Sequence, residues 1–532
     1  MKYEGSGKPT PRIIVLTVAL AALLLIKFCW SLTVSAVPFG YDAGIYRALF
    51  TWHAMGWPPF MPMPVPPWAQ SHPLGLFAFS SLLLKMGMPV DVLLGWGWNL
   101  FAAVPAFVLA AVMWKSRSPK VAVALLCVAV LSVAQYEGFI AMYAKVFAAL
   151  AWCALALHLF ELRNRWWVLP GMFVLATHLQ VGLILGVTVV SWCVQRFVAG
   201  SRKDALFGAW TGILALALGG AWYWQNFVYS VLPSAGKVVA SVDGSAVLMG
   251  ICILALAMAA FLSMRRVSVA AFARPSGTCA MYGVLLLVAL GIGQLELHPQ
   301  ATPSGSFLPA LEYVWLSFPL LLLSCIGLAL SVRSNRCGDT WQWAVVWSAA
   351  FVLAKFFFYL RFLLLLDFFL LPFAAIALEE LWCGSKRMWR WLAILFVCVQ
   401  CILAVQRLQQ LRPEFSTEQL QAIAVMEQRI APRSTVLVLD TSIAPWAMGL
   451  LPRADVVAPG MFQSPSYKHW EQFMYGTHAD RVAFFGMFRK PAFVYAGPAF
   501  HAFYPSEVQS AVLQDPCMQP AGEQGWYAVS CP

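Results

Sequence analysis

Two acidic residues of this chain stand where long apolar segments end, and both are candidates for acid–base chemistry. Asp42 follows the first apolar segment in the sequence GYDAGIY, and Glu137 lies in QYEG, a short connection between the third and fourth. A carboxylate held beside a substrate hydroxyl can accept its proton as a general base. An Asp directly after a helix is also a common turn residue, so the surrounding residues must decide between the two interpretations.

Basic residues and histidines form the second half of the pattern. They are predicted at the same membrane level as the two acids, and cations bind phosphate through charge-assisted hydrogen bonds. The candidate phosphate-binding residues are His72, His178, His298, Lys355 and Arg361. A phosphate-bearing lipid that enters from the bilayer would need such a mixture of acids and cations. Asp367 lies within an apolar segment, where an ionisable residue is either functional or part of an ion pair that joins two helices.

The composition identifies the class of protein that holds these residues. Of 532 residues, 61% are hydrophobic and 11% are charged, and the mean hydropathy is +0.74. Soluble globular proteins are about 45–50% apolar and about 25% charged. One soluble core could not bury so much apolar surface, which excludes a soluble enzyme, a disordered chain and a nucleic-acid-binding module. The chain is therefore predicted to be a polytopic α-helical membrane protein.

Apolar windows of about 17–25 residues predict about 13 transmembrane helices. They lie near 13–34, 92–114, 121–135, 139–160, 166–178, 180–195, 205–227, 246–263, 279–297, 310–332, 341–357, 362–380 and 389–406. The loops of one side carry 19 Lys and Arg residues, and those of the other side carry six: Arg47, Lys85, Lys145, Lys237, Lys355 and Arg361. Because cytoplasmic loops are enriched in Lys and Arg, the N-terminus is predicted in the cytoplasm and the C-terminal tail outside.

The first outer loop, about residues 35–91, is long and rich in Pro and aromatic residues. Long loops in compact proteins are usually functional, although these residues could also serve only to anchor the loop at the membrane surface. The residues expected to contact an acceptor or lipid are Tyr41, Tyr46, Arg47, Trp57, Trp68 and Tyr136. Segment 73–90 is apolar but short and broken, and is predicted to be a juxtamembrane helix. The first span could also be a signal peptide cleaved after Ala36, but its long apolar run favours a retained helix.

Residues 1–406 are thus predicted to form a transmembrane domain, and residues 407–532 a small extracytoplasmic α/β domain. In this tail, Ser416 to Gln419 has the pattern of a capping box at a helix start, and strands are expected near 435–439, 492–495 and 526–529. Eleven of the 13 cysteines lie in or beside predicted spans. The other two, Cys517 and Cys531, are predicted to form a disulfide in an oxidising compartment.

Together these features resemble the GT-C superfamily of membrane glycosyltransferases, which use polyprenyl-phosphate sugar donors. The resemblance rests on GYDAGIY after the first span, on His72-Pro73 before an apolar helix, on Glu137 at the next outer turn, and on RFL, which begins with Arg361. The outer α/β domain matches as well. The chain is similar to bacterial aminoarabinose and arabinofuranosyl transferases and to protein mannosyltransferases, some of which have Lys where this chain has His72.

The resemblance implies an inverting transfer of a sugar at the outer face of a bacterial inner membrane. The acceptor would be a glycan, a lipid or a protein such as a pilin. Asp42 would be the base, Glu137 would orient the acceptor or share that role, and Arg361 with His72 or Lys355 would stabilise the departing phosphate. No cofactor is expected, although some of these relatives use a divalent metal and others do not, so a divalent metal stays an alternative. The absence of a DxD sequence favours a metal-independent reaction. One alternative is an O-antigen ligase or polymerase, which should have its large loop between late spans. Another is a lipid-linked-sugar flippase or transporter, which should have an internal repeat, and a third is a purely structural membrane protein.

Overall fold

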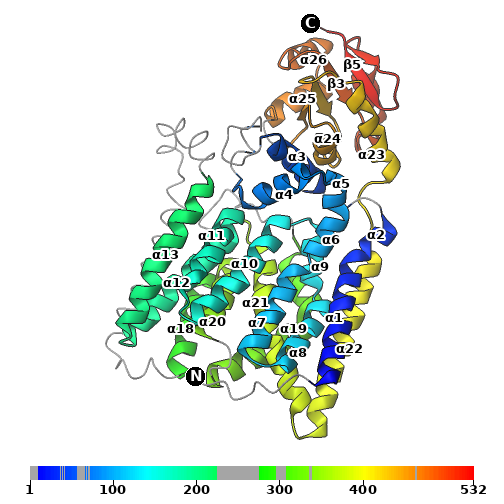
Figure 1. Ribbon diagram of the computed structural model, residues 1–532. Coiled ribbons are helices and arrows are strands. Elements are labelled where there is room, and N and C mark those ends of the chain that lie inside the picture. Colours follow the sequence, from blue (N-terminus) through cyan, green and yellow to red (C-terminus); the bar gives the residue numbers. More distant parts are fainter. Residues whose placement is uncertain are drawn as a thin grey trace. The chain divides into compact units, whose positions relative to one another are not determined.

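The structure is a computed structural model that describes residues 10–35, 38, 40, 42–56, 66, 69, 72–223, 275–294, 307–334, 338–461 and 464–531. The predicted span at 246–263 and the candidate residues Tyr41, Trp57, Trp68 and His298 lie outside this set. The chain divides into two compact units (Figure 1). The helical unit contains residues 1–30, 73–76 and 99–411, and the α/β unit contains residues 31–72, 77–98 and 412–532.

Each of the other predicted spans coincides with helix. The main helices of the helical unit are α1 (Pro11–Cys29), α7 (Val104–Ser116), α8 (Pro119–Leu131), α9 (Val133–Ile140), α10 (Ala144–Glu161), α11 (Val168–Thr177), α12 (Leu179–Val198), α13 (Arg202–Gly220), α18 (Pro275–Gln294), α19 (Ala310–Ser334), α20 (Asp339–Leu353), α21 (Arg361–Cys383) and α22 (Arg387–Gln410). Helix α6 (Trp98–Phe101) precedes α7.

Among the described residues, eight helical segments are long and apolar enough to cross a membrane, or nine if the bent pair α8–α9 is one span. The chain is therefore a multi-pass membrane protein. The predicted count of 13 is not confirmed, because α11 and α20 have 10 and 15 residues, fewer than the roughly 17 that a span needs.

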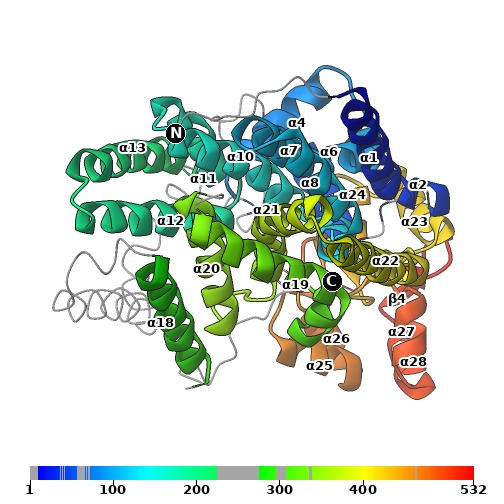
Figure 2. The same ribbon diagram turned by 90° about the horizontal axis from the view of Figure 1, so that it is seen from below.

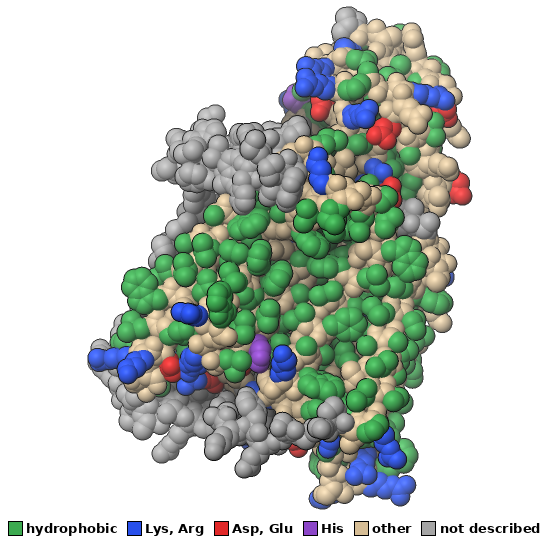
Figure 3. Space-filling model, viewed as in Figure 1, with side chains coloured by type: hydrophobic (Ala, Val, Ile, Leu, Met, Phe, Trp, Pro, Cys, Tyr) green, Lys and Arg blue, Asp and Glu red, His purple; other side chains and the backbone are tan. Residues whose placement is uncertain are grey.

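Helix α21 lies at the centre of the helical unit, where it packs against α8, α19, α20 and α22 (Figure 2). Its most apolar window is 83% buried, compared with 17% for α1 and for α22. A helix that is apolar on all sides belongs in an interior, so a polar residue on α21 must find its partners within the protein. Figure 3 shows an apolar surface across the middle of the helical unit, with Lys and Arg side chains gathered at its lower end. An apolar belt bounded by basic residues suits a lipid environment.

The α/β unit combines two distant parts of the chain. The first part contains α2 (Ser31–Val34), α3 (Asp42–Met55), most of α4 (Gly75–Lys85), α5 (Val90–Val92) and the π-helical turn η2 (Leu93–Gly97). With 11 residues, α4 is the short helix predicted in segment 73–90. The tail contains α23 (Thr417–Ala424), α24 (Ala444–Leu450), α25 (Tyr467–Tyr475), α26 (His478–Phe485), α27 (Pro498–Phe503) and α28 (Ser506–Leu513) around one sheet.

The sheet has the strand order β2-β1-β3-β5-β4. Strands β1 (Thr435–Val438), β2 (Asp455–Val457) and β3 (Ala492–Tyr495) are parallel, and β5 (Trp526–Val529) runs antiparallel to β3 and to β4 (Met518–Pro520). The three predicted strands are confirmed as β1, β3 and β5. The capping box is also confirmed, since the side chains of Ser416 and Gln419 each accept a hydrogen bond from the other residue's backbone N–H. The predicted disulfide joins Cys517 to Cys531.

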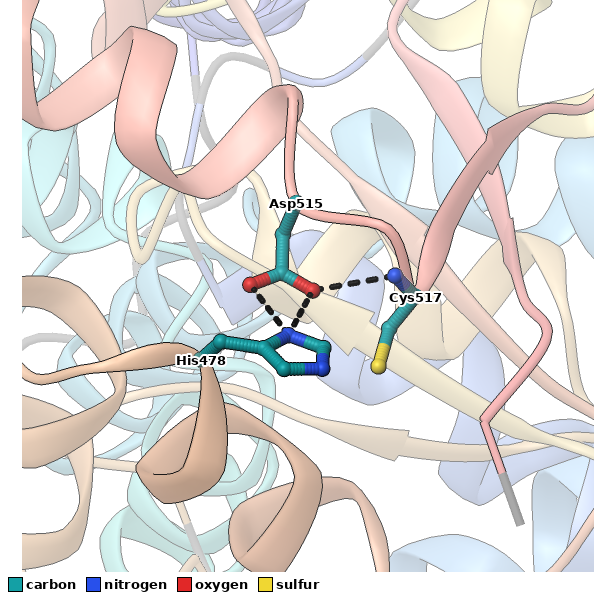
Figure 4. Close-up of side chains that lie close together, drawn as sticks. All are labelled: His478, Asp515 and Cys517. Atoms are coloured by element: carbon teal, nitrogen blue, oxygen red, sulfur yellow. Dashed lines mark hydrogen bonds and ion pairs between the residues drawn. The ribbon is translucent and has the colours of Figure 1, made fainter.

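Asp515 organises the turn that leads into this disulfide (Figure 4). Its carboxylate accepts hydrogen bonds from the backbone N–H of Cys517 at 2.9 Å, from Nδ1 of His478 at 3.0 Å and from Nη1 of Arg481 at 3.3 Å. Burial acts to raise the pKa of Asp515, but these three hydrogen bonds outweigh it, and the pKa lies below its ordinary value. The charged carboxylate therefore stabilises the fold.

We expect this carboxylate to make the α/β unit sensitive to acid. Because its pKa is lower in the folded than in the unfolded state, its contribution is present above the unfolded value of about 3.9 and is lost as pH falls through the folded value. Between about pH 5 and pH 3, wild-type protein should therefore lose more stability than Asp515→Asn. Urea-induced loss of hydrogen-exchange protection in peptides from residues 412–531 would measure this. An identical pH dependence in the two proteins would contradict the assignment.

Candidate active site

A buried polar cluster surrounds the junction of α8 and α9, where the helix axis bends by 54°. Ser132 has an extended backbone there, and its Oγ caps α9 by accepting a hydrogen bond from the backbone N–H of Gln135 at 3.1 Å. The same hydroxyl donates to Oδ2 of Asp367 on α21 at 2.7 Å, and Nε2 of Gln135 donates to that oxygen at 3.0 Å. A carboxylate on the central helix thus fixes the first turn of α9.

Lys27 of α1 binds the other side of the junction. Its Nζ donates to the carbonyl oxygens of Ser132 at 2.6 Å and of Ala129 at 3.2 Å, at the end of α8. Lys27 and Asp367 are 7% and 3% exposed, and the positive charge of Lys27 acts on the carboxylate of Asp367. Asp367 therefore joins α21 to α9 through hydrogen bonds to Ser132 and Gln135. Among the described residues it forms no direct ion pair, which was one of the two roles that the sequence suggests for it.

Glu137 lies on α9, and not in a short connection as the sequence predicts. The prediction is wrong because helix resumes directly after Ser132, and the chain turns only at residues 141–143. The carboxylate of Glu137 forms an ion pair with Arg407 of α22, whose Nη1 also lies 3.4 Å from Glu312 of α19. A carboxylate held by a guanidinium suits a positioning role better than proton transfer. The neighbouring Tyr136 is 2% exposed and its ring lies 5.8 Å from Nζ of Lys27.

Arg361 begins α21, and aromatic rings hold its guanidinium. The guanidinium carbon lies 5.1 Å from the ring centre of Tyr143 and 4.7 Å from that of Phe358. Its Nε is buried and has no hydrogen-bond partner among the described residues. Stacking holds a guanidinium without using its N–H donors. The charges of Arg361 and of Lys145 on α10 both act on His178, so we name Lys145, His178 and Arg361 the cationic group.

His178 contributes a hydrogen-bond donor to this group. It separates α11 from α12, and its Nδ1 accepts a long hydrogen bond from the backbone N–H of Val181 at 3.5 Å. A neutral ring whose Nδ1 accepts must carry its hydrogen on Nε2. Burial opposes a second proton on this ring, and the positive charges of Lys145 and Arg361 oppose it further. His178 therefore offers an N–H donor and not the positive charge that its place among the phosphate-binding candidates implies.

The other candidates are distributed over both units. Lys355 is exposed in the connection between α20 and α21 of the helical unit. In the α/β unit, Asp42 is the half-buried first residue of α3, and the ring of His72 lies 6.2 Å from that of Phe77. Tyr46, 5% exposed, packs its ring against Phe50.

Arg47 is engaged within the protein. Its guanidinium donates to Asp91 at 2.8 and 3.2 Å and to the carbonyl oxygen of Gly449 at 2.5 Å. These contacts give Arg47 a structural role, while its predicted contact with an acceptor stays a prediction.

Within the described part of the chain, one group has the residue types of a metal site. Its members, His478, Asp515 and Cys517, place their ligand atoms within 4.8 Å of one another (Figure 4). The fit is poor, because Cys517 is bound to Cys531 and has no thiolate to offer, and Asp515 is already hydrogen-bonded to Arg481. We assign no metal chemistry to this group.

Three residues of the helical unit were not predicted as site residues: Lys27, Lys145 and Arg407. Lys27 carried a usable signal, since a lone charge within an apolar span is a functional candidate. Lys145 and Arg407 stand at helix ends, where basic residues are common, and only their tertiary partners distinguish them.

The chain was compared with solved structures and known proteins. The chain matches an Archaeoglobus fulgidus oligosaccharyltransferase, solved with zinc and sulfate, with a TM-score of 0.57 and 13% identity over 90% of this chain and 68% of that one. It also matches ArnT from Cupriavidus metallidurans bound to undecaprenyl phosphate, with a TM-score of 0.41 and 14% identity over 98% of each chain. No protein-family model matches the sequence, and no curated protein matches it.

The first of these similarities shows a shared fold. This chain therefore shares the fold of the oligosaccharyltransferase, which agrees with the fold that the sequence resemblance implies. At 13% identity the similarity concerns the arrangement of the chain and does not extend to substrates.

We expect Lys27 and Asp367 to depend on each other for stability. Removing one of two buried charges of opposite sign leaves the other less well compensated, whereas replacing both with apolar residues can be close to neutral. Lys27→Met and Asp367→Leu should each lower the melting temperature of the detergent-solubilised protein. The double variant should melt above both single variants. A double variant whose loss equals the sum of the two would show that the charges are independent.

Proposed function

We propose that the protein is a membrane glycosyltransferase that moves a sugar from a polyprenyl-phosphate donor to an acceptor hydroxyl. The cationic group carries this proposal. It gathers two positive charges and an N–H donor in one region of a GT-C fold, and phosphate is an anion that such a group binds well. The Lys and Arg distribution supports a reaction at the outer face of a bacterial inner membrane, with the N-terminus in the cytoplasm.

The proposed reaction is a single displacement. The acceptor oxygen attacks the anomeric carbon of the sugar opposite the phosphate and gives its proton to a carboxylate. The bond between the anomeric carbon and the phosphate oxygen breaks, and its electron pair leaves with the lipid phosphate. One displacement inverts the anomeric configuration.

The cationic group would stabilise the leaving phosphate. Negative charge grows on the phosphate oxygens in the transition state, and fixed positive charges aimed at them lower the barrier. Arg361 can offer two parallel N–H donors, whereas Lys145 acts as a point charge. His178 would add one hydrogen bond through Nε2. Lys355 and His72 are further candidates for the same role.

Asp42 is the proposed general base, on the strength of its place in the sequence GYDAGIY. Glu137, held by Arg407, would orient the acceptor. The acceptor is a glycan, a lipid or a protein such as a pilin, and the predicted contacts of Tyr41, Trp57 and Trp68 would help to bind it. Comparison by mass spectrometry of surface glycans, lipids and pilin-type proteins with and without the gene would identify the acceptor.

We expect Asp42→Asn to abolish transfer while the protein still inserts and folds. Asn keeps the size and shape of Asp but cannot accept a proton at neutral pH, and loss of a general base typically costs about 10²–10⁴ in rate. Sugar transfer from a polyprenyl phosphate by purified protein would be measured. Asn replaces Asp well in a turn, so an Asp42→Asn protein with normal activity would show that Asp42 is only structural.

The Arg361 series tests the phosphate contact. Arg361→Ala should reduce donor turnover by about 10²-fold or more, as is typical when a transition-state donor is removed, and Arg361→Lys should recover part of it because the charge remains. Arg333→Ala, which removes an exposed Arg from α19, is the matched control and should behave as wild type. Normal donor turnover by Arg361→Ala would place the phosphate site elsewhere.

A further inference from the structure

Helices α3 and α24 of the α/β unit cross in direct backbone contact. A Cβ atom added at Gly44 of α3 would collide with the carbonyl group of Pro445 and the backbone nitrogen of Trp446. One added at Gly449 of α24 would collide with the carbonyl oxygen of Gly44 and lie 3.1 Å from Cβ of Arg47. Only glycine permits so close an approach of two backbones, so these positions set the distance between the helices.

Hydrogen bonds fix the crossing along its length. Nη1 of Arg47 donates to the carbonyl oxygen of Gly449 at 2.5 Å, and Nε1 of Trp52 donates to that of Pro452 at 3.0 Å. Both acceptors lie at or just beyond the C-terminal end of α24, where carbonyl groups lack intrahelical donors and a positive charge is favourable. Successive turns of α3 are therefore tied to α24.

Helix α24 is in turn fixed to the sheet. It follows β1 through a loop in which Oδ1 of Asp440 accepts from the backbone N–H of Ser442 at 3.1 Å and from its hydroxyl at 2.6 Å. Oδ2 of Asp440 accepts from the backbone N–H of Ala499, in α27, at 3.2 Å. The side chains of Trp446 and Met448 are 3% and 4% exposed. The position of α24 is thus determined by the tail.

We propose that the tail positions the catalytic base, with Gly44, Arg47 and Gly449 as positioning residues. Asp42 is the first residue of α3 and lies two positions before Gly44, so any shift of α24 against the first turn of α3 moves its carboxylate. The inference rests on the proposed role of Asp42. The tail supplies no reacting group, but by this proposal it affects the rate of the chemical step because it fixes the position of Asp42.

The decisive experiment combines Gly449→Ala with Asp42→Asn in the full-length protein. A displacement of about 1 Å at a reacting group can cost about 10²-fold, so Gly449→Ala should lower kcat by about that factor and leave the donor KM unchanged. In the Asp42→Asn background the same change should have no further effect on the residual rate. Gly486→Ala is the matched control, because a methyl group there meets its nearest neighbour at 3.4 Å, and its kcat should equal that of wild type.

Each outcome has one interpretation. An unchanged kcat in Gly449→Ala, or an equal loss in the Asp42→Asn background, would overturn the positioning role while leaving the transferase function intact. A wild-type protein that transfers no sugar would overturn the proposed function and this inference with it.

Arg47→Lys provides a second test if Gly449→Ala does not fold. It keeps the charge but loses the planar fork that binds Gly449 and Asp91 together, and should lower kcat about tenfold without raising the acceptor KM. Gly486→Ala again serves as the control and should behave as wild type. A raised acceptor KM with normal kcat in Arg47→Lys would assign Arg47 to acceptor binding and contradict the proposal.

Discussion

The amino group of Lys27 is the contact on which the helical unit depends. It binds the carbonyl groups at the end of α8, so α8 can stop there and α9 can leave at 54°. The stop frees the hydroxyl of Ser132 to cap α9 and to bind Asp367 of α21. Burying charges is expensive unless each one is paired and hydrogen-bonded. The bent geometry is therefore the one in which Lys27 and Asp367 are both satisfied.

That geometry also determines what α9 presents to its neighbours. After the bend, Glu137 meets Arg407 of α22, and through it Glu312 of α19. If α8 and α9 formed one straight helix, Glu137 would point in a different direction. The acid that the sequence marks as a candidate is thus held by a guanidinium 270 residues later in the chain. The cationic group is built in a similar way, because Lys145, His178 and Arg361 stand at the ends of three different helices.

Local signals in the sequence were sufficient to predict the helices and strands, but not the contacts between them. Apolar runs predicted the helices, the pattern around Ser416 predicted a capped helix, and the two cysteines of the C-terminal tail predicted the disulfide. The apolar pattern continues across Ser132, so the bend was not predictable, since Lys27 and Asp367 contact Ser132 from 105 and 235 residues away. Strands β2 and β4, with three residues each, are too short to show alternation. Contacts such as Arg47 with Gly449 join residues 402 positions apart and leave no local trace.

The crossing of α3 and α24 has a consequence for how this protein can be recombined. A cut near residue 411 looks attractive for exchanging the tail with that of a related protein, because helix α22 ends there. Such a chimera would separate Gly449 from α3, whose backbone it touches. A new tail with any larger residue at that position could not pack against α3. The transplantable module is instead discontinuous: residues 42–56 would have to travel together with residues 412–531.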